Sequence, residues 1–232
     1  MPHRPSALFP AACLCLTLGL GLIAGLAAPA LAAKPQAAAQ PSSLTAEARA
    51  DVQAAEDYLN SLRTLKARFV QTDNGGHQSA GNFLLKRPGR MRFEYDKPVN
   101  DFIVADGTFV HYYDARMQQQ SSAPISRTLA NFFLQKDIKI SGDIAVDDVR
   151  RENDGHLLVI TVSQAKDPLS GNLSIAFDRD PKTGALSLSR WRVVDPQGLI
   201  TEITLADVKT GISLDNGLFH YYDPQRTKPR YN

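Results

Sequence analysis

Cysteine is nearly absent from the 232-residue chain: there are two, at positions 13 and 15. No thiol lies beyond residue 32, which excludes disulfides, thiol catalysis and cysteine-ligated metals from that part of the chain. The chain has no glycine-rich phosphate loop, no H-E-x-x-H pair and no G-x-S-x-G elbow. The histidines beyond residue 32 are scattered singly: His77, His111, His156 and His220. We therefore expect no metal site, no cofactor and no enzymatic activity.

An excess of charge is also lacking. The first 32 residues contain one basic residue, Arg4, and no acid, so 25 basic and 24 acidic residues remain after them. This balance gives no electrostatic reason to expect a nucleic-acid partner or attachment to an anionic membrane surface.

The only long apolar run lies near the amino terminus, from Ala7 to Leu26. Arg4 precedes it and the small-residue site Ala30-Leu31-Ala32 follows it, a pattern typical of a cleaved secretory signal peptide over residues 1–32. A permanent membrane anchor is the alternative, because the run approaches spanning length. Residues 33–43 are rich in Ala, Gln, Pro and Ser and are expected to form a flexible leader. The expected domain covers residues 44–222, and residues 223–232 are expected to form a loose tail.

Two segments have helical periodicity. Apolar residues recur at helical spacing from Leu44 to Leu62, which predicts an amphipathic helix with Thr45 as its N-cap. Pro124 suits the start of a second helix, predicted over Ile125 to Leu134. Its apolar side would consist of Ile125, Leu129, Phe132 and Phe133.

Most of the remaining chain alternates with the period of a strand. Met91, Phe93 and Tyr95 share one face of the run 90–95, while charged residues occupy the other. Phe69, and then Phe83 with Leu85, lie on the apolar faces of two earlier runs. Whether the run of Phe83 continues past Pro88 is left open. Further strands are predicted at 103–105 and, after a tight turn at 106–107, at 108–113, then at 138–140, 157–164, 172–178, 185–194, 200–209 and 218–222, with turn sequences between them.

This order of elements predicts one α+β domain with a large antiparallel sheet. Because two helices cannot cover both faces of such a sheet, it must curl to protect its apolar side.

Six short segments follow one another along the chain: A-R-F-V-Q at 67–71, L-L-K-R-P at 84–88, F-E-Y at 93–95, I-V-A-D-G at 103–107, Y-Y-D at 112–114 and L-F-H at 218–220. In their order and spacing they resemble the LolA family of periplasmic lipoprotein carriers. The resemblance implies an unclosed, strongly curved antiparallel β half-barrel with an α-helical lid over an apolar cavity. It also implies a monomer located in the periplasm.

The resemblance further implies a set of site residues. Arg87 would connect the barrel to the lid, and Met91 stands where well-known members carry a phenylalanine at the cavity mouth. The other cavity and lid positions would be Phe93, Tyr95, Phe69, Phe83, Leu85, Leu129, Phe132 and Phe133. From spacing alone, the favoured interpretation of Arg87 is a solvated strand end, and that of the apolar residues is an ordinary core.

The implied function is to carry acylated lipoproteins from the inner to the outer membrane. The implied partners are those lipoproteins, an inner-membrane ABC transporter of the LolCDE type and, if one exists, an outer-membrane acceptor of the LolB type. Two alternatives stay open. One is a half-barrel that binds other lipids or senses lipoproteins, and the other is a periplasmic hydrolase that depends on His111 or His220.

Overall fold

The structure is a computed structural model that describes residues 44–128 and 130–224. Its helices are α1 (Ala46–Ser61) and α2 (Asn131–Leu134), with 3-10 turns η1 (Ile125–Arg127), η2 (Asn153–Gly155) and η3 (Asn216–Phe219). Its strands are β1 (Thr64–Thr72), β2 (Gln78–Lys86), β3 (Arg90–Tyr95), β4 (Phe102–Asp106), β5 (Phe109–Asp114), β6 (Gln119–Pro124), β7 (Ile144–Glu152), β8 (Leu157–Gln164), β9 (Asp167–Arg179), β10 (Leu186–Val194) and β11 (Ile200–Thr210).

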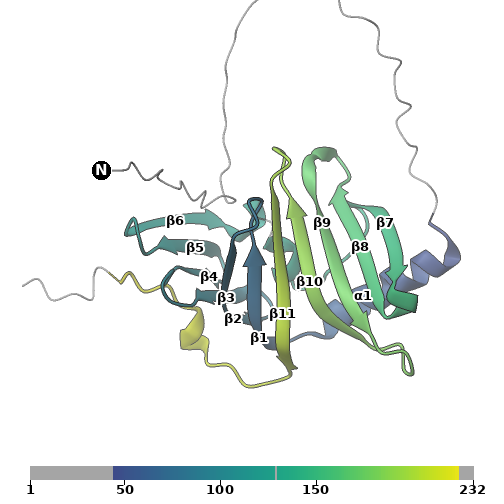
Figure 1. The fold of residues 1–232 in the computed structure, drawn as a ribbon, viewed down its shortest axis with the longest axis horizontal. Helices are drawn as coiled ribbons and strands as arrows, with labels where there is room; N and C mark the ends of the chain where they lie inside the picture. Colours follow the sequence, from purple (N-terminus) through teal and green to yellow (C-terminus); the bar gives the residue numbers. More distant parts are fainter. Residues whose placement is uncertain (1–43, 129, 225–232) are drawn as a thin grey trace, which may run out of the picture. The chain divides into compact units, whose positions relative to one another are not determined.

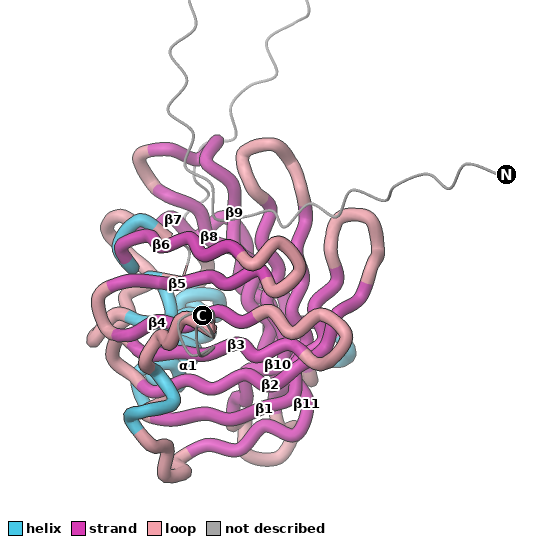
Figure 2. The backbone as a smooth tube through the Cα atoms, turned by 90° about the vertical axis from the view of Figure 1, so that its left-hand side faces the viewer, coloured by secondary structure: helices cyan, strands magenta, loops and turns pink. Residues whose placement is uncertain are grey.

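All the strands belong to one antiparallel sheet of 11 strands, in the order β6-β5-β4-β3-β2-β1-β11-β10-β9-β8-β7. The first strand pairs with the last, so the two halves of the meander join at the centre of the sheet. The sheet curves strongly (Figure 1), and a view turned by 90° follows the strands from β6 to β1 (Figure 2). Because β6 and β7 are both edge strands, the sheet is not closed. The predicted fold class, an unclosed curved antiparallel sheet with few helices, is confirmed.

Alternation decides which side chains face the inside of the curve. Phe83 pairs with Phe93 across β2 and β3, and both are buried in the main core together with Phe69. The predicted alternation from Arg90 to Tyr95 is confirmed, because Met91 and Phe93 are buried while Glu94 is exposed. Pro88 and Gly89 form a turn, so β2 and β3 are two separate strands.

The predicted first helix is confirmed as α1. The Thr45 hydroxyl accepts a hydrogen bond from the Ala48 amide at 3.1 Å, which caps the helix. Its buried side includes Val52, Ala55 and Leu59, and it packs against β7 and β10.

The prediction of one helix from Ile125 to Leu134 is wrong, because the segment breaks between η1 and α2. Thr128 has extended backbone angles (φ −120°, ψ 155°), and its hydroxyl donates to the Ile125 carbonyl at 2.9 Å. A threonine side chain that bonds locally to the backbone competes with helix continuation. Only a single 3-10 turn and a four-residue helix result.

Two predicted strands are also wrong. Residues 138–140 form no ladder, because the amides of Ile138 and Ile140 donate to side chains of α1 instead. The region 218–222 contains the end of η3 and no strand. There, Phe219 packs on Leu84 at the outer face of the sheet.

Candidate functional site

Arg87 lies at the junction of the sheet, α1 and the segment after α2, and only 7% of it is exposed. One guanidinium nitrogen, Nη1, donates to the Leu59 carbonyl at the end of α1. The other, Nη2, donates to the carbonyls of Gln135 at 2.8 Å and Lys136 at 3.2 Å. One planar side chain thus bonds two separate segments that cover the inner face of the sheet. In the following, α1, α2 and residues 135–140 are called the lid.

The surroundings of Arg87 are unusual for a charged side chain. Burial lowers the pKa of Arg87, nearby Arg63 lowers it further, and Asp137 raises it. Arginine nevertheless stays charged in proteins. Its hydrogen bonds go to backbone carbonyls at the end of α1 and in the segment after α2, and not to a carboxylate. Arg87 therefore loses hydrogen bonds if either of the two lid segments moves away.

Further hydrogen bonds connect the lid internally and to the sheet. The Asn60 side chain forms two bonds with Ile138, donating to its carbonyl at 2.9 Å and accepting from its amide at 2.8 Å. The Gly89 amide, in the turn after Arg87, donates to the Leu134 carbonyl at 2.9 Å. These bonds connect the lid segments to each other and to the turn between β2 and β3.

The inner face beneath the lid has a wall of aromatic rings. The Phe83 and Phe93 centroids lie 4.5 Å apart, and Phe69 lies edge-on to both Phe93 and Tyr95 at 5.1 Å. Trp191 of β10 extends the wall, with its ring 5.5 Å from Phe83. Such ring contacts stabilise the fold beyond the free energy gained by removing apolar area from water.

Tyr95 is the polar member of this wall. Its hydroxyl donates to the Gln71 side chain at 2.6 Å. Burial raises the pKa of Tyr95 well above its ordinary value, Asp101 raises it further, and the bond to Gln71 lowers it. The phenol therefore stays neutral at physiological pH, so the wall carries no charge at this point.

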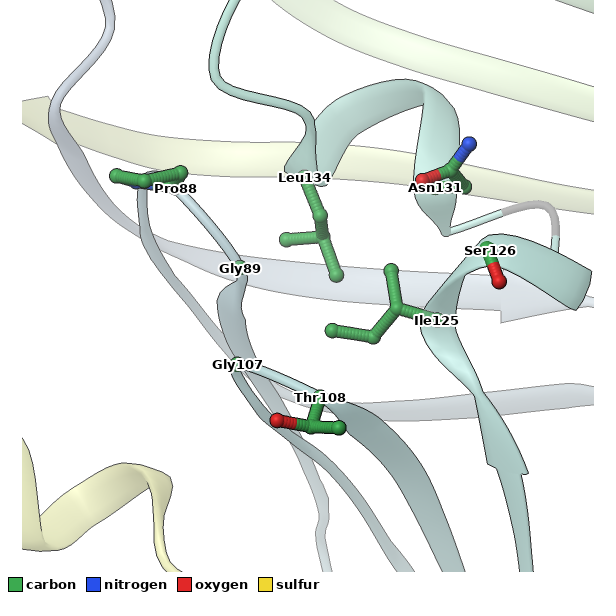
Figure 3. Close-up of a pocket in the computed structure, with 8 residues that line it drawn as sticks. All are labelled: Pro88, Gly89, Gly107, Thr108, Ile125, Ser126, Asn131 and Leu134. Carbon is green, nitrogen blue, oxygen red and sulfur yellow. The ribbon is translucent and has the colours of Figure 1, made fainter.

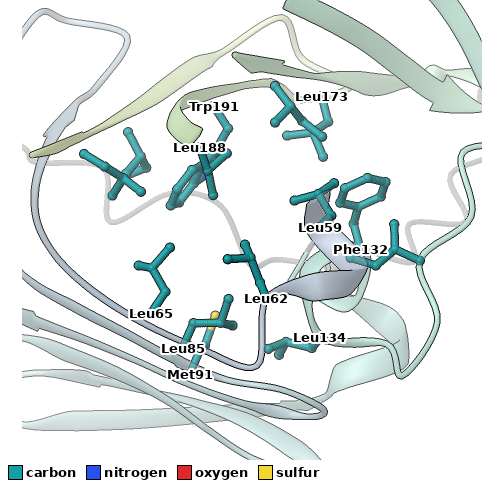
Figure 4. Packing of buried hydrophobic residues seen from close by; sticks show 14 of the residues in the cluster. Leu59, Leu62, Leu65, Leu85, Met91, Phe132, Leu134, Leu173, Leu188 and Trp191 are labelled. Carbon is teal, nitrogen blue, oxygen red and sulfur yellow. The ribbon is translucent and has the colours of Figure 1, made fainter. Parts of the chain in front are cut away.

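Lid side chains fill the interior that the wall encloses. Leu62, the C-cap of α1, points toward Leu65 and Leu85 of the sheet, and Leu59 lies beside Phe132 near Leu173 (Figure 4). Phe133 packs on Trp191, with ring centroids 5.3 Å apart. The apolar groups of the lid thus occupy the space in which an apolar ligand would make the same contacts.

Open space is found at the rim. A pocket of about 420 Å³ lies between α2, η1 and the turns after β2 and β4 (Figure 3). Its lining is Pro88, Gly89, Gly107, Thr108, Ile125, Ser126, Asn131 and Leu134. A second pocket of about 290 Å³ lies between the start of α1 and β7.

The predicted site residues are mostly brought together. Phe69, Phe83, Leu85, Met91, Phe93 and Phe132 belong to the buried core, with Tyr95 and Phe133 partly buried against it. Leu129 lies outside the described residues. Trp191 and Asn60 were not among the predicted site residues.

The opposite end of α1 is bonded to strand β7. Arg151 donates to the Asp51 carboxylate through Nε at 2.8 Å and Nη2 at 2.7 Å, and Nη1 bonds to Glu47. Asp51 is itself only 7% exposed. Bidentate pairs of this kind fix orientation as well as position.

Asp51→Ala is expected to lower the free energy of unfolding by about 1–3 kcal/mol, because Arg151 then loses both bonds to a buried acceptor. Glu47→Ala is the matched control. The Glu47 side chain is 68% exposed, so its removal should change stability by less than about 0.5 kcal/mol. Urea unfolding followed by circular dichroism measures both variants, and equal losses would show that Asp51 has no special role.

A polar cluster on the outer face contains His111. Its ring contacts Ser122 Oγ at 2.8 Å through Nδ1 and Asp106 Oδ2 at 3.0 Å through Nε2, and it stacks on Tyr221 at 5.0 Å. Burial raises the pKa of Asp106, but the amides of Phe109 and Thr108 together with His111 bring it below its ordinary value. These contacts hold the turn that begins at Asp106 and the segment around Tyr221 against the outer face of the sheet, away from the aromatic wall.

Residues 44–128 and 130–224 contain no group of three or more His, Cys, Asp or Glu side chains placed to bind a metal ion. No helix within these ranges is long and apolar enough to cross a membrane.

A curved, unclosed antiparallel sheet whose apolar inner face is covered by a few short helical segments defines a protein of the half-barrel class. A family model described as outer membrane lipoprotein carrier protein LolA matches residues 60–222. The chain therefore belongs to the LolA family.

Individual relatives agree with the family match. An outer-membrane lipoprotein carrier protein of Methylococcus capsulatus is 29% identical over 177 residues, covering 73% of this chain and 82% of that protein. One of Pseudomonas aeruginosa PAO1 is 30% identical over 188 residues, covering 77% and 86%. A solved structure of a LolA superfamily protein from Nitrosomonas europaea aligns at 12% identity with a TM-score of 0.44, over 74% of this chain and 97% of that one.

Proposed function

We propose that this protein is a non-enzymatic periplasmic carrier. It binds the acyl chains of lipoproteins released from the inner membrane and delivers them to the outer membrane. It receives them from an ABC transporter of the LolCDE type and passes them to an acceptor of the LolB type where one exists. A signal peptide over residues 1–32 takes it to the periplasm.

The observation that carries this proposal is the aromatic inner face beneath a lid latched by Arg87. An acyl chain in water exposes apolar area worth roughly 0.8 kcal/mol per methylene, so several long chains need a large apolar surface. In the structure, the lid residues Leu59, Phe132 and Leu134 are buried against that surface.

Exchange of lid groups for acyl chains explains how a carrier can release what it binds. The ligand gains contacts with the wall, while the displaced lid side chains lose theirs. Only the difference contributes to affinity, which keeps binding reversible. The names of the relatives from Methylococcus and Pseudomonas, outer-membrane lipoprotein carrier protein, support the same cargo.

A release assay tests the proposal. The protein is added to spheroplasts or to proteoliposomes containing the transporter, the membranes are removed, and lipoproteins bound to it are measured in the supernatant. We expect soluble complexes close to one to one. Binding of phospholipid in place of lipoprotein would indicate the lipid-binding alternative, and an empty supernatant with a working transporter would contradict the carrier function.

A further inference from the structure

The sheet ends in two edge strands that differ in charge. β7 carries five charged side chains between Asp147 and Glu152. Among them, Arg150 pairs with Asp148 at 3.0 Å and with Glu152 at 3.6 Å. β6 has the sequence Q-Q-S-S-A-P and no charged side chain. Because charged side chains keep an exposed edge from pairing with another chain, the β7 edge is protected in this way and the β6 edge is not.

The backbone of β6 presents hydrogen-bonding groups along this edge. The Ile125 amide, just after the strand, donates to the Thr108 carbonyl, just before β5, at 3.0 Å. The register of β5 and β6 continues from this bond without a bulge. Residues of an antiparallel pair alternate between bonding to the partner strand and facing away from it. Gln120 and Ser122 therefore direct their amides and carbonyls away from β5, to a side on which none of the described strands pairs with β6.

The β6 edge borders the apolar interior. Ile125 follows the strand directly and is buried in the main core. Val110 of β5, which pairs with Ala123 of β6, is buried there too. Since the sheet is not closed, β6 is one of the two strands that border its opening. A polypeptide whose acyl chains occupy the inner face and which leaves through the opening must pass one of these two edges.

We propose that the polypeptide next to the acyl chains of a bound lipoprotein adds to the sheet as a further strand beside β6. This inference rests on the proposed carrier function and names the part of the cargo that the edge binds. Main-chain hydrogen bonds do not depend on side chains, so one edge can accept lipoproteins of different sequence. The neutral side chains of β6 neither attract nor repel a charge on the incoming strand.

The acyl chains make this strand pairing effective. A peptide without them loses its translational and rotational freedom for a few main-chain bonds, so it should bind weakly. Once the acyl chains are held at the inner face, pairing with β6 becomes intramolecular and takes place at a high effective concentration. We therefore expect the edge to add affinity for acylated peptides and to bind the same peptides poorly when they carry no acyl chain.

Ser122→Pro tests the edge. The substitution removes the amide that faces the open side and leaves the bonds to β5 in place, a position at which edge strands tolerate proline. Because the Ser122 hydroxyl also contacts His111 at 2.8 Å, Ser122→Ala is the matched control.

Three synthetic lipopeptides with the same triacylated terminus serve as probes. The short one has about two residues, and the long one has about ten, enough to span a typical strand. The third has the length of the long one but consists of sarcosine, whose N-methylated amides cannot donate hydrogen bonds. It tests the edge in the wild-type protein, so the test does not depend on the folding of a variant.

The readout is the affinity of each protein for each lipopeptide. We expect the wild-type protein and Ser122→Ala to bind the long lipopeptide about tenfold more tightly than the short one. This gain should disappear in Ser122→Pro and with the sarcosine lipopeptide.

Equal affinity of the wild-type protein for the long and short lipopeptides would overturn the edge assignment while leaving the carrier function intact. A gain that persists in Ser122→Pro or with the sarcosine lipopeptide would overturn it as well. Dimerisation of the wild-type protein that Ser122→Pro abolishes, measured by analytical ultracentrifugation, would assign the edge to a second copy of the chain instead. Failure of the wild-type protein to bind any of the lipopeptides would contradict the carrier function itself.

Discussion

Arg87→Leu is expected to leave the sheet folded and to reduce lipoprotein delivery at least tenfold. The substitution removes the donors to Leu59, Gln135 and Lys136 and leaves their carbonyls without these bonds. Because each bond to a charged donor contributes about 1.5–3 kcal/mol, the lid should lose most of its attachment at this corner. Without these hydrogen bonds the lid is expected to open and close independently of cargo binding. The variant should therefore release lipoprotein before it reaches the outer membrane or fail to release it there.

Arg90→Leu is the matched control for this prediction. Arg90 lies three residues further on, and its guanidinium bonds on the outer face to Asn216 at 3.3 Å. Hydrogen exchange of the lid amides measures loosening, and transfer from the carrier to outer-membrane vesicles measures delivery. If Arg87→Leu and Arg90→Leu delivered lipoproteins equally well, Arg87 would not be a latch.

Phe93→Ala is expected to lower the free energy of unfolding by about 3–5 kcal/mol, the usual loss when a buried phenylalanine is truncated. Phe93 lies at the centre of the wall, with Phe69, Phe83 and Trp191 all around its ring. The cavity left behind should be apolar, and a dry apolar cavity binds apolar ligands.

The same variant should therefore gain more from a bound acyl chain than the wild-type protein does. Thermal unfolding with and without a triacylated lipopeptide measures this gain, since ligands that bind only the folded state raise its stability. Phe102→Ala is the control, because Phe102 stacks on Tyr113 and Tyr221 at the outer face. A ligand-induced shift no larger in Phe93→Ala than in Phe102→Ala would contradict a ligand site at the wall.

Strand patterns allowed much of the inner face to be predicted. Phe69, Phe83, Phe93 and Met91 lie as their alternation indicated, because one face of each strand is buried and the other is not. Trp191 was missed for a physical reason. A register shift between Leu188 and Arg190 changes the parity of β10, so Leu188 and Trp191 both face inward although they are three residues apart.

The edge strands were missed for a different reason. β6 has the sequence Q-Q-S-S-A-P, with four exposed residues, and most of β7 is at least partly exposed. Edge strands bury little side-chain area, so no clear alternation marks them. Their pairing with β5 and β8 is visible only when those partners are in place.

The sequence by itself determined the antiparallel strands with one apolar face, the N-cap of α1 at Thr45 and the resemblance to the LolA family. These depend on local periodicity and on short segments that a reader can compare directly. Only the tertiary structure decided that Arg87 bonds Leu59, Gln135 and Lys136, and that Asp51 meets Arg151. The Asp51 and Arg151 positions lie 100 residues apart. No local pattern encodes such meetings, because they arise from the curvature of the whole sheet and the packing of the lid against it.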